Sequence, residues 1–286
     1  MLAGQLGQRE QIAPGVWRLP LPLPSATLPP YDHTNSYLVQ SGGAGVLIDA
    51  GSEDPEVLGG LYSTLDAFGV TPTALLLTHT HPDHCAGAEV LGQRYGVSVF
   101  VHPLEQPRLD FPTRSLQGGE EVRVGASVLR ALHTPGHNPG HLSFFLPHTR
   151  AALVGDLLTA TGSTWVGQPE GDVSDYLASL DRLEALGATV LGPGHGDPVT
   201  HPAARIQAVR AHRLDREAEI LRVLENPHSL TALLDRVYPD VSSTLRRAAE
   251  GTLRAHLSRL LREGRVVAIT GAEDSYQTVT QKKPPS

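Results

Sequence analysis

The stretch Ala-Leu-Leu-Leu-Thr-His-Thr-His-Pro-Asp-His at residues 74–84 carries the strongest structural signal in the chain. Its apolar start predicts a buried strand, so His79 and His81, two residues apart, leave the strand end toward one point. The proline that follows cannot continue a strand ladder, so the chain turns before it presents Asp83 and His84 as a second pair. Two adjacent ligand pairs predict two adjacent metal ions.

Three more candidate ligands, His137, Asp156 and His195, each follow a short apolar run farther along the chain, at residues 128–132, 152–154 and 189–191. The glycines beside these residues would be accounted for by ordinary turns. Loops at strand ends are, however, also where a rigid sheet gathers distant residues into one site. The set as a whole favours the second interpretation. It predicts one metal ion held by His79, His81 and His137, another held by Asp83, His84 and His195, and Asp156 as a carboxylate bridging both.

The donor types indicate the metal and the chemistry. Zn²⁺ takes neutral imidazole and carboxylate and leaves one position for water in catalytic sites, although Mn²⁺ and Fe²⁺ accept the same ligands. Two such cations would lower the pKa of a bridging water toward ~7 and so supply a hydroxide nucleophile. Direct hydrolysis then requires no serine or cysteine nucleophile.

These clusters resemble the metallo-β-lactamase superfamily, whose αββα four-layer sandwich binds one or two metals through His-x-His-x-Asp-His, a later His, a bridging Asp and a final His. The chain matches every position of that pattern. Flavodiiron proteins carry Glu where this chain has His81, so the resemblance implies hydrolysis rather than oxygen reduction. Secreted β-lactamases mostly carry Arg where this chain has His84, but one group shares the His.

Other residues are candidates for supporting roles. The resemblance implies that Asp83 also steers the hydroxide or shuttles a proton, and His141, four residues after His137, could bind substrate or donate a proton. Metal-bound imidazoles need partners for their other nitrogen. Asp49, at the end of a predicted strand, is the first candidate for that role, and Thr78 and Asp197 are weaker ones. Resemblance alone places Asn35, Ser163 and Thr164 in the pocket wall.

The segments before residue 200 predict alternating strands and helices. Strands are expected at residues 15–19, 36–40 and 46–49, a helix at 55–68, and a hairpin from 122–124 and 127–132. A later helix is expected to open at Ser174 and to stop at Gly187, with leucines at helical spacing. Sheets flanked by helices fit a four-layer α/β sandwich, which we assign to residues 1–205.

Residues 206–286 are expected to form a small winged-helix domain. Helices are predicted from about 203 to 224, from Ser229, and from about 243 to 263, followed by a strand at 265–269. The third helix places Leu245, Leu253, Leu257, Leu260 and Leu261 on its apolar side. With this module the chain resembles the β-lactamase-like protein 2 branch of the superfamily, which includes a metal-dependent endoribonuclease and many bacterial relatives.

Charge separates the two parts and bears on the substrate. Residues 1–200 hold 9 Lys+Arg against 20 Asp+Glu, whereas residues 201–286 hold 14 against 10. Single-stranded RNA is one candidate substrate, because the third helix could contact phosphates. The arginines on or directly after this helix are Arg246, Arg247, Arg254, Arg259, Arg262 and Arg265. Interspersed Glu250 and Glu263 allow the alternative that these arginines form a solvated helical face.

A small ester, thioester or lactone is the other main candidate substrate, because an acidic domain disfavours non-specific polyanion binding. Glyoxalase II fits less well, since a winged helix stands where its glutathione-binding helices would be. Dioxygenase chemistry at a single iron, and a winged-helix DNA-binding regulator with a non-catalytic metal site, remain as alternatives. Duplex DNA is not the expected partner.

The composition indicates a cytoplasmic protein without a membrane segment. Residues 1–30 contain no apolar run long enough for a signal sequence, and no stretch approaches the roughly 18 apolar residues that span a bilayer. The single cysteine, Cys85, excludes a disulfide framework within the chain and is expected to be buried behind the metal loop. The length of 286 residues and 40% hydrophobic content allow one large domain and one small one.

Overall fold

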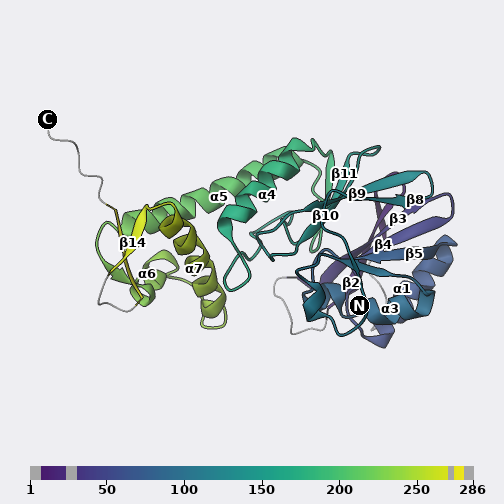
Figure 1. The fold of residues 1–286 in the computed structure, drawn as a ribbon, viewed down its shortest axis with the longest axis horizontal. Coiled ribbons are helices and arrows are strands. Elements are labelled where there is room, and N and C mark those ends of the chain that lie inside the picture. The colour runs from purple at the N-terminus through teal and green to yellow at the C-terminus, as the bar shows by residue number, and fades with distance from the viewer. Residues whose placement is uncertain (1–7, 24–30, 270–273, 280–286) are drawn as a thin grey trace.

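The structure, a computed structural model, describes residues 8–23, 31–269 and 274–279. Its broad part is a sandwich of two sheets, and one long helix leads from it into a small C-terminal module (Figure 1). The first sheet has the strand order β1-β2-β3-β4-β5-β6-β7. Its strands are β1 (Glu10–Ala13), β2 (Val16–Pro22), β3 (His33–Ser41), β4 (Ala44–Ile48), β5 (Thr71–Leu76), β6 (Val99–Val101) and β7 (Arg114–Ser115).

Helices α1 (Pro55–Phe68) and α3 (Ala88–Tyr95) cover the outer face of this sheet. Helix α1 matches the predicted span because both of its ends are defined by sequence. The Asp54 side chain accepts a hydrogen bond from the backbone N–H of Glu56 at its start, and Gly69 adopts φ +62° after its end. Its apolar stripe packs against the side chains of β4 and β5 that point to the outer face of the sheet.

The second sheet has the order β12-β11-β10-β9-β8 and packs face to face against the first. Its strands are β8 (Glu121–Val124), β9 (Ser127–His133), β10 (Leu142–Leu146), β11 (Ala151–Gly155) and β12 (Val190–Pro193). Helices α4 (Val173–Ala185) and α5 (Pro202–Val223) cover its other face. The layers are therefore helix, sheet, sheet and helix, which confirms the predicted αββα sandwich.

Helix α4 begins one residue earlier than predicted. Asp172, not Ser174, caps it, because the Asp172 side chain accepts hydrogen bonds from the backbone N–H groups of Ser174 and Asp175. The buried face consists of Val173, Tyr176, Ser179, Leu180 and Leu183.

The C-terminal module confirms the predicted winged helix. It contains the end of α5, then β13 (His228–Ser229), α6 (Leu230–Val237), α7 (Arg246–Arg262), β14 (Val266–Ala268) and β15 (Ser275–Thr278). The three strands form a sheet of order β13-β15-β14, and an apolar core fills the space between the helices. Two leucines expected on the apolar side of α7 are exposed. Leu245 (55% exposed) precedes the helix, and Leu261 (37%) faces outward in its last turn.

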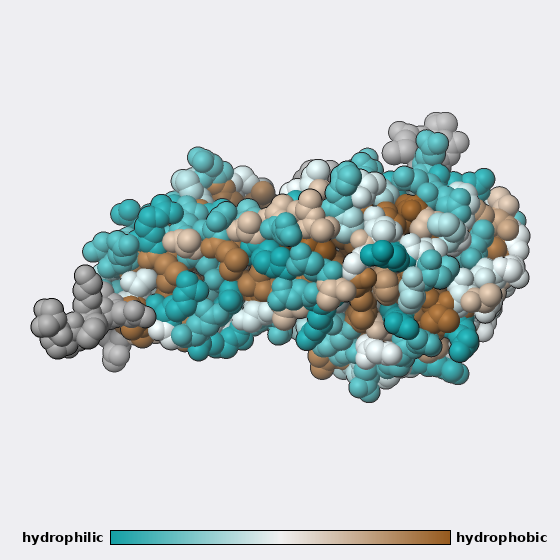
Figure 2. Space-filling view, turned by 90° about the horizontal axis from the view of Figure 1, so that it is seen from above, coloured by the Kyte–Doolittle hydropathy of each residue, from teal (hydrophilic) through white to brown (hydrophobic). Residues whose placement is uncertain are grey.

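Helix α5 belongs to both parts. Ile206 and Val209 pack into the sandwich core, whereas Ile220 and Leu224 pack into the core of the C-terminal module. The domain boundary proposed at residues 205 and 206 lies inside this continuous helix. Hydrophilic and hydrophobic side chains are interspersed along the face seen from above (Figure 2). Among the described residues, no helix has the length and apolar character needed to cross a bilayer.

Candidate metal centre

The predicted ligands meet at one edge of the sandwich because strand ends deliver them there. Strand β4 pairs in parallel with β5, and β11 pairs in parallel with β12, so the carboxyl ends within each pair lie on the same edge. His79 and His81 follow β5, and Asp83 and His84 lie on the one-turn helix α2 (Pro82–Cys85). The remaining ligands follow other strands: His137 follows β9, Asp156 follows β11 and His195 follows β12.

All seven predicted ligands come together in two groups. His79, His81, His137 and Asp156 form one group, and Asp83, His84 and His195 form the other, with candidate ligand atoms in each group within 4.8 Å of one another. We call these the first and second ligand groups.

Asp156 faces both groups. Its Oδ1 lies 3.4 Å from His84 Nε2 and 3.5 Å from His195 Nε2, while its Oδ2 lies 3.6 Å from His137 Nε2. This is the position expected of a bridging carboxylate.

Two buried atoms without hydrogen-bond partners bear on whether cations fit this centre. His79 Nε2 and Asp156 Oδ1 are buried and have no hydrogen-bond partner within the described structure. Buried polar atoms are mostly paired in folded proteins, and a cation in contact with these two atoms would supply the missing partner. The other ring nitrogen of His79, Nδ1, lies 3.0 Å from Thr78 Oγ1 and leaves Nε2 free toward the cluster. The donor set therefore fits divalent cations.

The ionisation states of the side chains also favour the binding of positively charged ions at this centre. Burial would raise the pKa of Asp156, but the positive charges of His84 and His195 hold it well below the usual range. Burial would lower the pKa of His195, yet Asp156 and Asp83 raise it to about 9. Burial lowers the pKa of His137 to about 4, despite the opposing charge of Asp156. The carboxylates are thus ionised and attract cations, as a metal site requires.

Asp49 lies behind the ligand cluster, where the sequence predicted a partner for the outer ring nitrogen of a ligand histidine. Its Oδ1 accepts a hydrogen bond from Thr78 N at 2.7 Å, and its Oδ2 accepts from Thr78 Oγ1 and His84 Nδ1, both at 2.8 Å. The His84 ring is thereby held with Nε2 directed at the cluster. Thr78, also a candidate, links Asp49 to His79. The weaker candidate Asp197 instead pairs with Arg18 at 3.3 Å and is largely exposed.

Asn35 supports the loop that carries His195. Its Nδ2 donates to the carbonyls of Pro193 (2.9 Å) and Gly196 (2.8 Å), and the side chain is fully buried. Resemblance suggested a place in the pocket wall, but these contacts give Asn35 a positioning role behind the ligand loop. Thr164 is buried beside Ser163, which is exposed.

His141 lies behind the ligand cluster and is fully buried. Its Nε2 accepts a hydrogen bond from the backbone N–H of Asp156 at 3.1 Å, and its Nδ1 lies 2.9 Å from Thr134 Oγ1. Both ring nitrogens are therefore engaged within the protein. The contacts hold Asp156 in place and leave no ring nitrogen to bind substrate, so the predicted catalytic role finds no support in this geometry.

The outer partners of His81 and His137 were not predicted from the sequence. The His137 Nδ1–H donates to the carbonyl of Trp165 at 2.7 Å, and His81 Nε2 lies 3.3 Å from Glu170 Oε2. Arg108 and Asn138 donate to Glu170 at 2.7 and 3.1 Å. No spacing or periodicity in the sequence links these segments.

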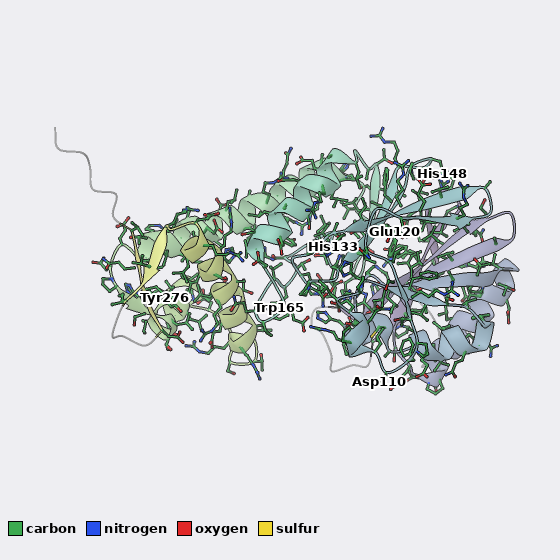
Figure 3. All side chains as sticks on the ribbon, viewed as in Figure 1. Asp110, Glu120, His133, His148, Trp165 and Tyr276 are labelled. Atoms are coloured by element: carbon green, nitrogen blue, oxygen red, sulfur yellow. The ribbon has the colours of Figure 1, made fainter. Side chains whose placement is uncertain are left out.

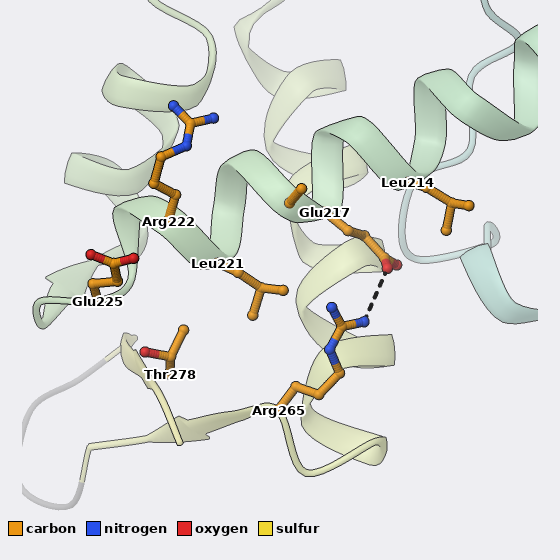
Figure 4. A pocket seen from close by; sticks show the side chains of 8 residues that line it. Leu214, Glu217, Leu221, Arg222, Glu225, Arg265 and Thr278 are labelled. Carbon is orange, nitrogen blue, oxygen red and sulfur yellow. Dashed lines mark hydrogen bonds and ion pairs between the residues drawn. The ribbon is translucent and has the colours of Figure 1, made fainter. Parts of the chain in front are cut away.

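A separate groove of about 540 Å³ lies in the C-terminal module between α5 and the segments around β14 and β15 (Figure 4). Its charged residues include Glu217 and Arg265, which pair with each other at 3.4 Å. The groove contributes no residue to either ligand group.

Comparison with known families agrees with the fold. The metallo-beta-lactamase superfamily matches residues 29–195, and the beta-lactamase associated winged helix domain matches residues 229–274. The chain therefore belongs to the metallo-β-lactamase superfamily and is a metal-dependent hydrolase of that fold with a winged-helix domain.

Individual relatives and a solved structure extend this match. A beta-lactamase-like protein 2 homolog of Caenorhabditis elegans is 29% identical over 81% of this chain and 79% of its own length. An atrochrysone carboxyl ACP thioesterase of Aspergillus terreus is 31% identical over 67% of this chain and 58% of its own length. The crystal structure of a metallo-β-lactamase family protein from Thermus thermophilus shares 28% identity and a TM-score of 0.78, covering 94% of this chain and all of that one.

Proposed function

We propose that this protein is a dinuclear zinc hydrolase that acts on a small thioester, ester or lactone. The observation that carries the proposal is the place of Asp156 between two ligand groups. Its Oδ1 faces His84 and His195, and its Oδ2 faces His137. A carboxylate shared in this way supports two cations side by side. The first group would hold one ion and the second group the other, with Asp156 contacting both.

Bound cations would activate a water molecule as the nucleophile and polarise the scissile carbonyl. The proton transfer is assigned to groups of the protein itself. The hydrogen bond from His195 and the charge of His84 outweigh burial and keep the pKa of Asp83 low, so this carboxylate is ionised at neutral pH. Its Oδ2 lies 3.2 Å from His195 Nε2 and 3.3 Å from Thr34 Oγ1. With its side chain 13% exposed, Asp83 can accept a proton at Oδ2 and return it to the leaving group.

A thioester is the preferred member of the substrate class. The Aspergillus terreus relative is named as an acyl carrier protein thioesterase, and this chain spans 58% of its length. The excess of acidic groups in residues 1–200 is no handicap for a neutral acyl group, whereas it opposes a polyanion.

The structure gives RNA and duplex DNA little support. Five of the six candidate arginines pair with carboxylates of this chain, so a phosphate would have to displace these partners. The pairs are Arg246 with Asp235 (2.6 Å), Arg254 with Glu250 and Asp274 (3.0 Å each), Arg259 with Glu217 (2.8 Å), Arg262 with Asp172 (2.7 Å) and Arg265 with Glu217 (3.4 Å).

The test is a turnover assay of metal-analysed protein on thioesters, esters, lactones and single-stranded RNA, with zinc content measured in parallel. We expect about two zinc ions per chain and thioester hydrolysis that Asp83→Asn and His84→Ala each abolish. His148→Ala is the matched control and should retain full activity, because His148 lies in the turn between β10 and β11, at the opposite end of β11 from Asp156. Figure 3 shows His148 at the periphery of the sandwich. Activity retained in both site variants would overturn the assigned site, and RNA cleavage alone would overturn the substrate class.

A further inference from the structure

The segment 164–172 connects the metal centre with the C-terminal module, and we call it the bridging segment. Toward the centre, its Trp165 carbonyl accepts a hydrogen bond from His137 Nδ1 at 2.7 Å. Its Glu170 carboxylate lies 3.3 Å from His81 Nε2. Both contacts engage the ring nitrogen that faces away from the cluster, so they fix how His81 and His137 present their other nitrogen.

On its other side, the bridging segment is attached to helix α7. Trp165 Nε1 donates to the Ala248 carbonyl at 3.1 Å, and the backbone N–H of Gln168 donates to the Gly251 carbonyl at 3.0 Å. Figure 3 shows Trp165 between the sandwich and α7.

Two arginines add to this attachment. Arg262, near the end of α7, pairs with Asp172 at 2.7 Å, and Arg213 of α5 donates to the Thr164 carbonyl. Helix α7 therefore holds the bridging segment in its middle and at its C-terminal end, and α5 holds its start.

Gly251 permits this close approach. A Cβ atom at this position would lie 3.0 Å from the Gln168 carbonyl oxygen and 3.5 Å from Trp165 Cζ2. Glycine is unfavourable inside a helix, so its presence in the middle of α7 has a packing reason here. A larger side chain would push α7 and the bridging segment apart.

Among the described residues, the second ligand group has no such connection. His84 Nδ1 is held by Asp49, and His195 Nδ1 donates to the His33 carbonyl at 3.1 Å. Both partners lie at or next to the ends of strands of the first sheet. Within this part of the chain, the first group alone therefore depends on residues that the C-terminal module holds in place.

We propose that the winged-helix module is a positioning element for one of the two metal ions. Helix α7 holds the bridging segment, the bridging segment orients His81 and His137, and the module thereby sets the metal affinity of the first ligand group but not of the second. This inference rests on the two-metal site of the proposed function. Trp165 and Glu170 act here as positioning residues, because they contact His137 and His81 on the side away from the cluster.

The test measures zinc affinity of the full chain by titration against a chromophoric chelator. In Gly251→Leu, one zinc ion should bind about 10- to 100-fold more weakly, the range typical for loss of a ligand's outer partner, while the other keeps its affinity. Gly59→Leu is the matched control, because Gly59 also lies inside a helix but an added Cβ meets nothing within 4 Å there. It should leave both affinities unchanged.

Two variants that each lack one ligand histidine show which ligand group binds the weakened ion. With His195→Ala the remaining ion occupies the first group, and Gly251→Leu should weaken it. With His137→Ala the remaining ion occupies the second group, and Gly251→Leu should have no effect. Trp165→Phe, which removes the hydrogen bond to α7 together with part of the indole ring, and Glu170→Gln should weaken the same ion. These two variants test the inference if Gly251→Leu does not fold.

Unchanged zinc affinity in folded Gly251→Leu, or equal weakening of both ions, would overturn the inference. Failure of the proposed function gives a different result. In that case wild-type protein would bind two zinc ions with the expected asymmetry among the variants but hydrolyse none of the thioesters, esters or lactones.

Discussion

Replacing Asp49 by asparagine should weaken metal binding at the second ligand group without unfolding the protein. Asparagine has nearly the same shape and tolerates the left-handed backbone that Asp49 adopts, φ +60°. The carboxylate receives three hydrogen bonds, two from Thr78 and one from His84. An asparagine amide has one acceptor oxygen, so in either orientation its NH₂ group would face at least one of these donors.

The size of the effect follows from burial. Asp49 is 2% exposed, so water cannot replace the lost acceptor for His84 Nδ1–H. Loss of an outer partner typically reduces metal affinity about 10- to 100-fold, which corresponds to about 1.4–2.7 kcal/mol. We expect one zinc ion to weaken by this factor in Asp49→Asn.

The assay is competition with a chelator of known zinc affinity, with circular dichroism to verify folding. Asp197→Asn is the control, because Asp197 is an exposed partner of Arg18 and touches no ligand. Its affinities should match those of the wild type. Wild-type affinity for both ions in folded Asp49→Asn would refute the reasoning, since it would mean that the orientation of His84 does not depend on this carboxylate.

Three further predictions concern buried groups. Burial raises the pKa of Cys85 to about 11, so at pH 8 the native thiol should react with iodoacetamide on the order of 100-fold more slowly than in denatured protein, and equal rates would contradict this. Burial, aided by the charge of Arg213, lowers the pKa of His256, so the unfolded state takes up the proton first and stability falls as the pH drops below 6.5. His256→Gln should lose less stability than wild type between pH 7 and 5 in urea titrations, by at most about 1.4 kcal/mol per pH unit, and parallel curves would exclude the effect. Tyr37→Phe removes a buried hydrogen bond to the Pro193 carbonyl (2.8 Å) and should lower the free energy of unfolding by about 0.5–1.5 kcal/mol in the same assay, whereas an unchanged midpoint would show that this bond contributes nothing.

The ligand set could be predicted from sequence because five of the seven ligands follow an apolar strand, and Asp83 and His84 come shortly after two of them. Residue type specifies the metal chemistry, and the end of an apolar run specifies the sheet edge, so the pattern of residues alone assigned His79, Asp156 and His195 to one site. Asp49 followed from the same rule, since it comes directly after β4. The outer partners of His81 and His137 obey no such rule. Glu170 reaches His81 from a loop 89 positions away, and only the folded chain brings them together.

Secondary structure was predictable where local signals were strong. Helix α1 has a capping aspartate, an initial proline and a terminal glycine, and its predicted span matches. Helix α3 was not predicted, because its eight residues are too few for a clear apolar period. Strand β10 is buried on both faces, and an apolar run of that kind cannot be distinguished from a buried helix by periodicity.

The exposed leucines of α7 show how tertiary contacts override a helical pattern. Leucine spacing alone predicted one apolar face, but α7 contacts several neighbours: α6 and β14 in its own module, α4 of the sandwich and the bridging segment. Between these contacts lies Gly251, a residue that no apolar pattern would select, where the backbone of α7 accepts a hydrogen bond from the bridging segment. The arginines that suggested a polyanion surface are occupied in the same assembly, since Arg262 pairs with Asp172 at the end of the bridging segment. The geometry thus assigns to α7 a role in holding the catalytic half of the chain, and the charge pattern that first favoured RNA is accounted for by contacts within the protein.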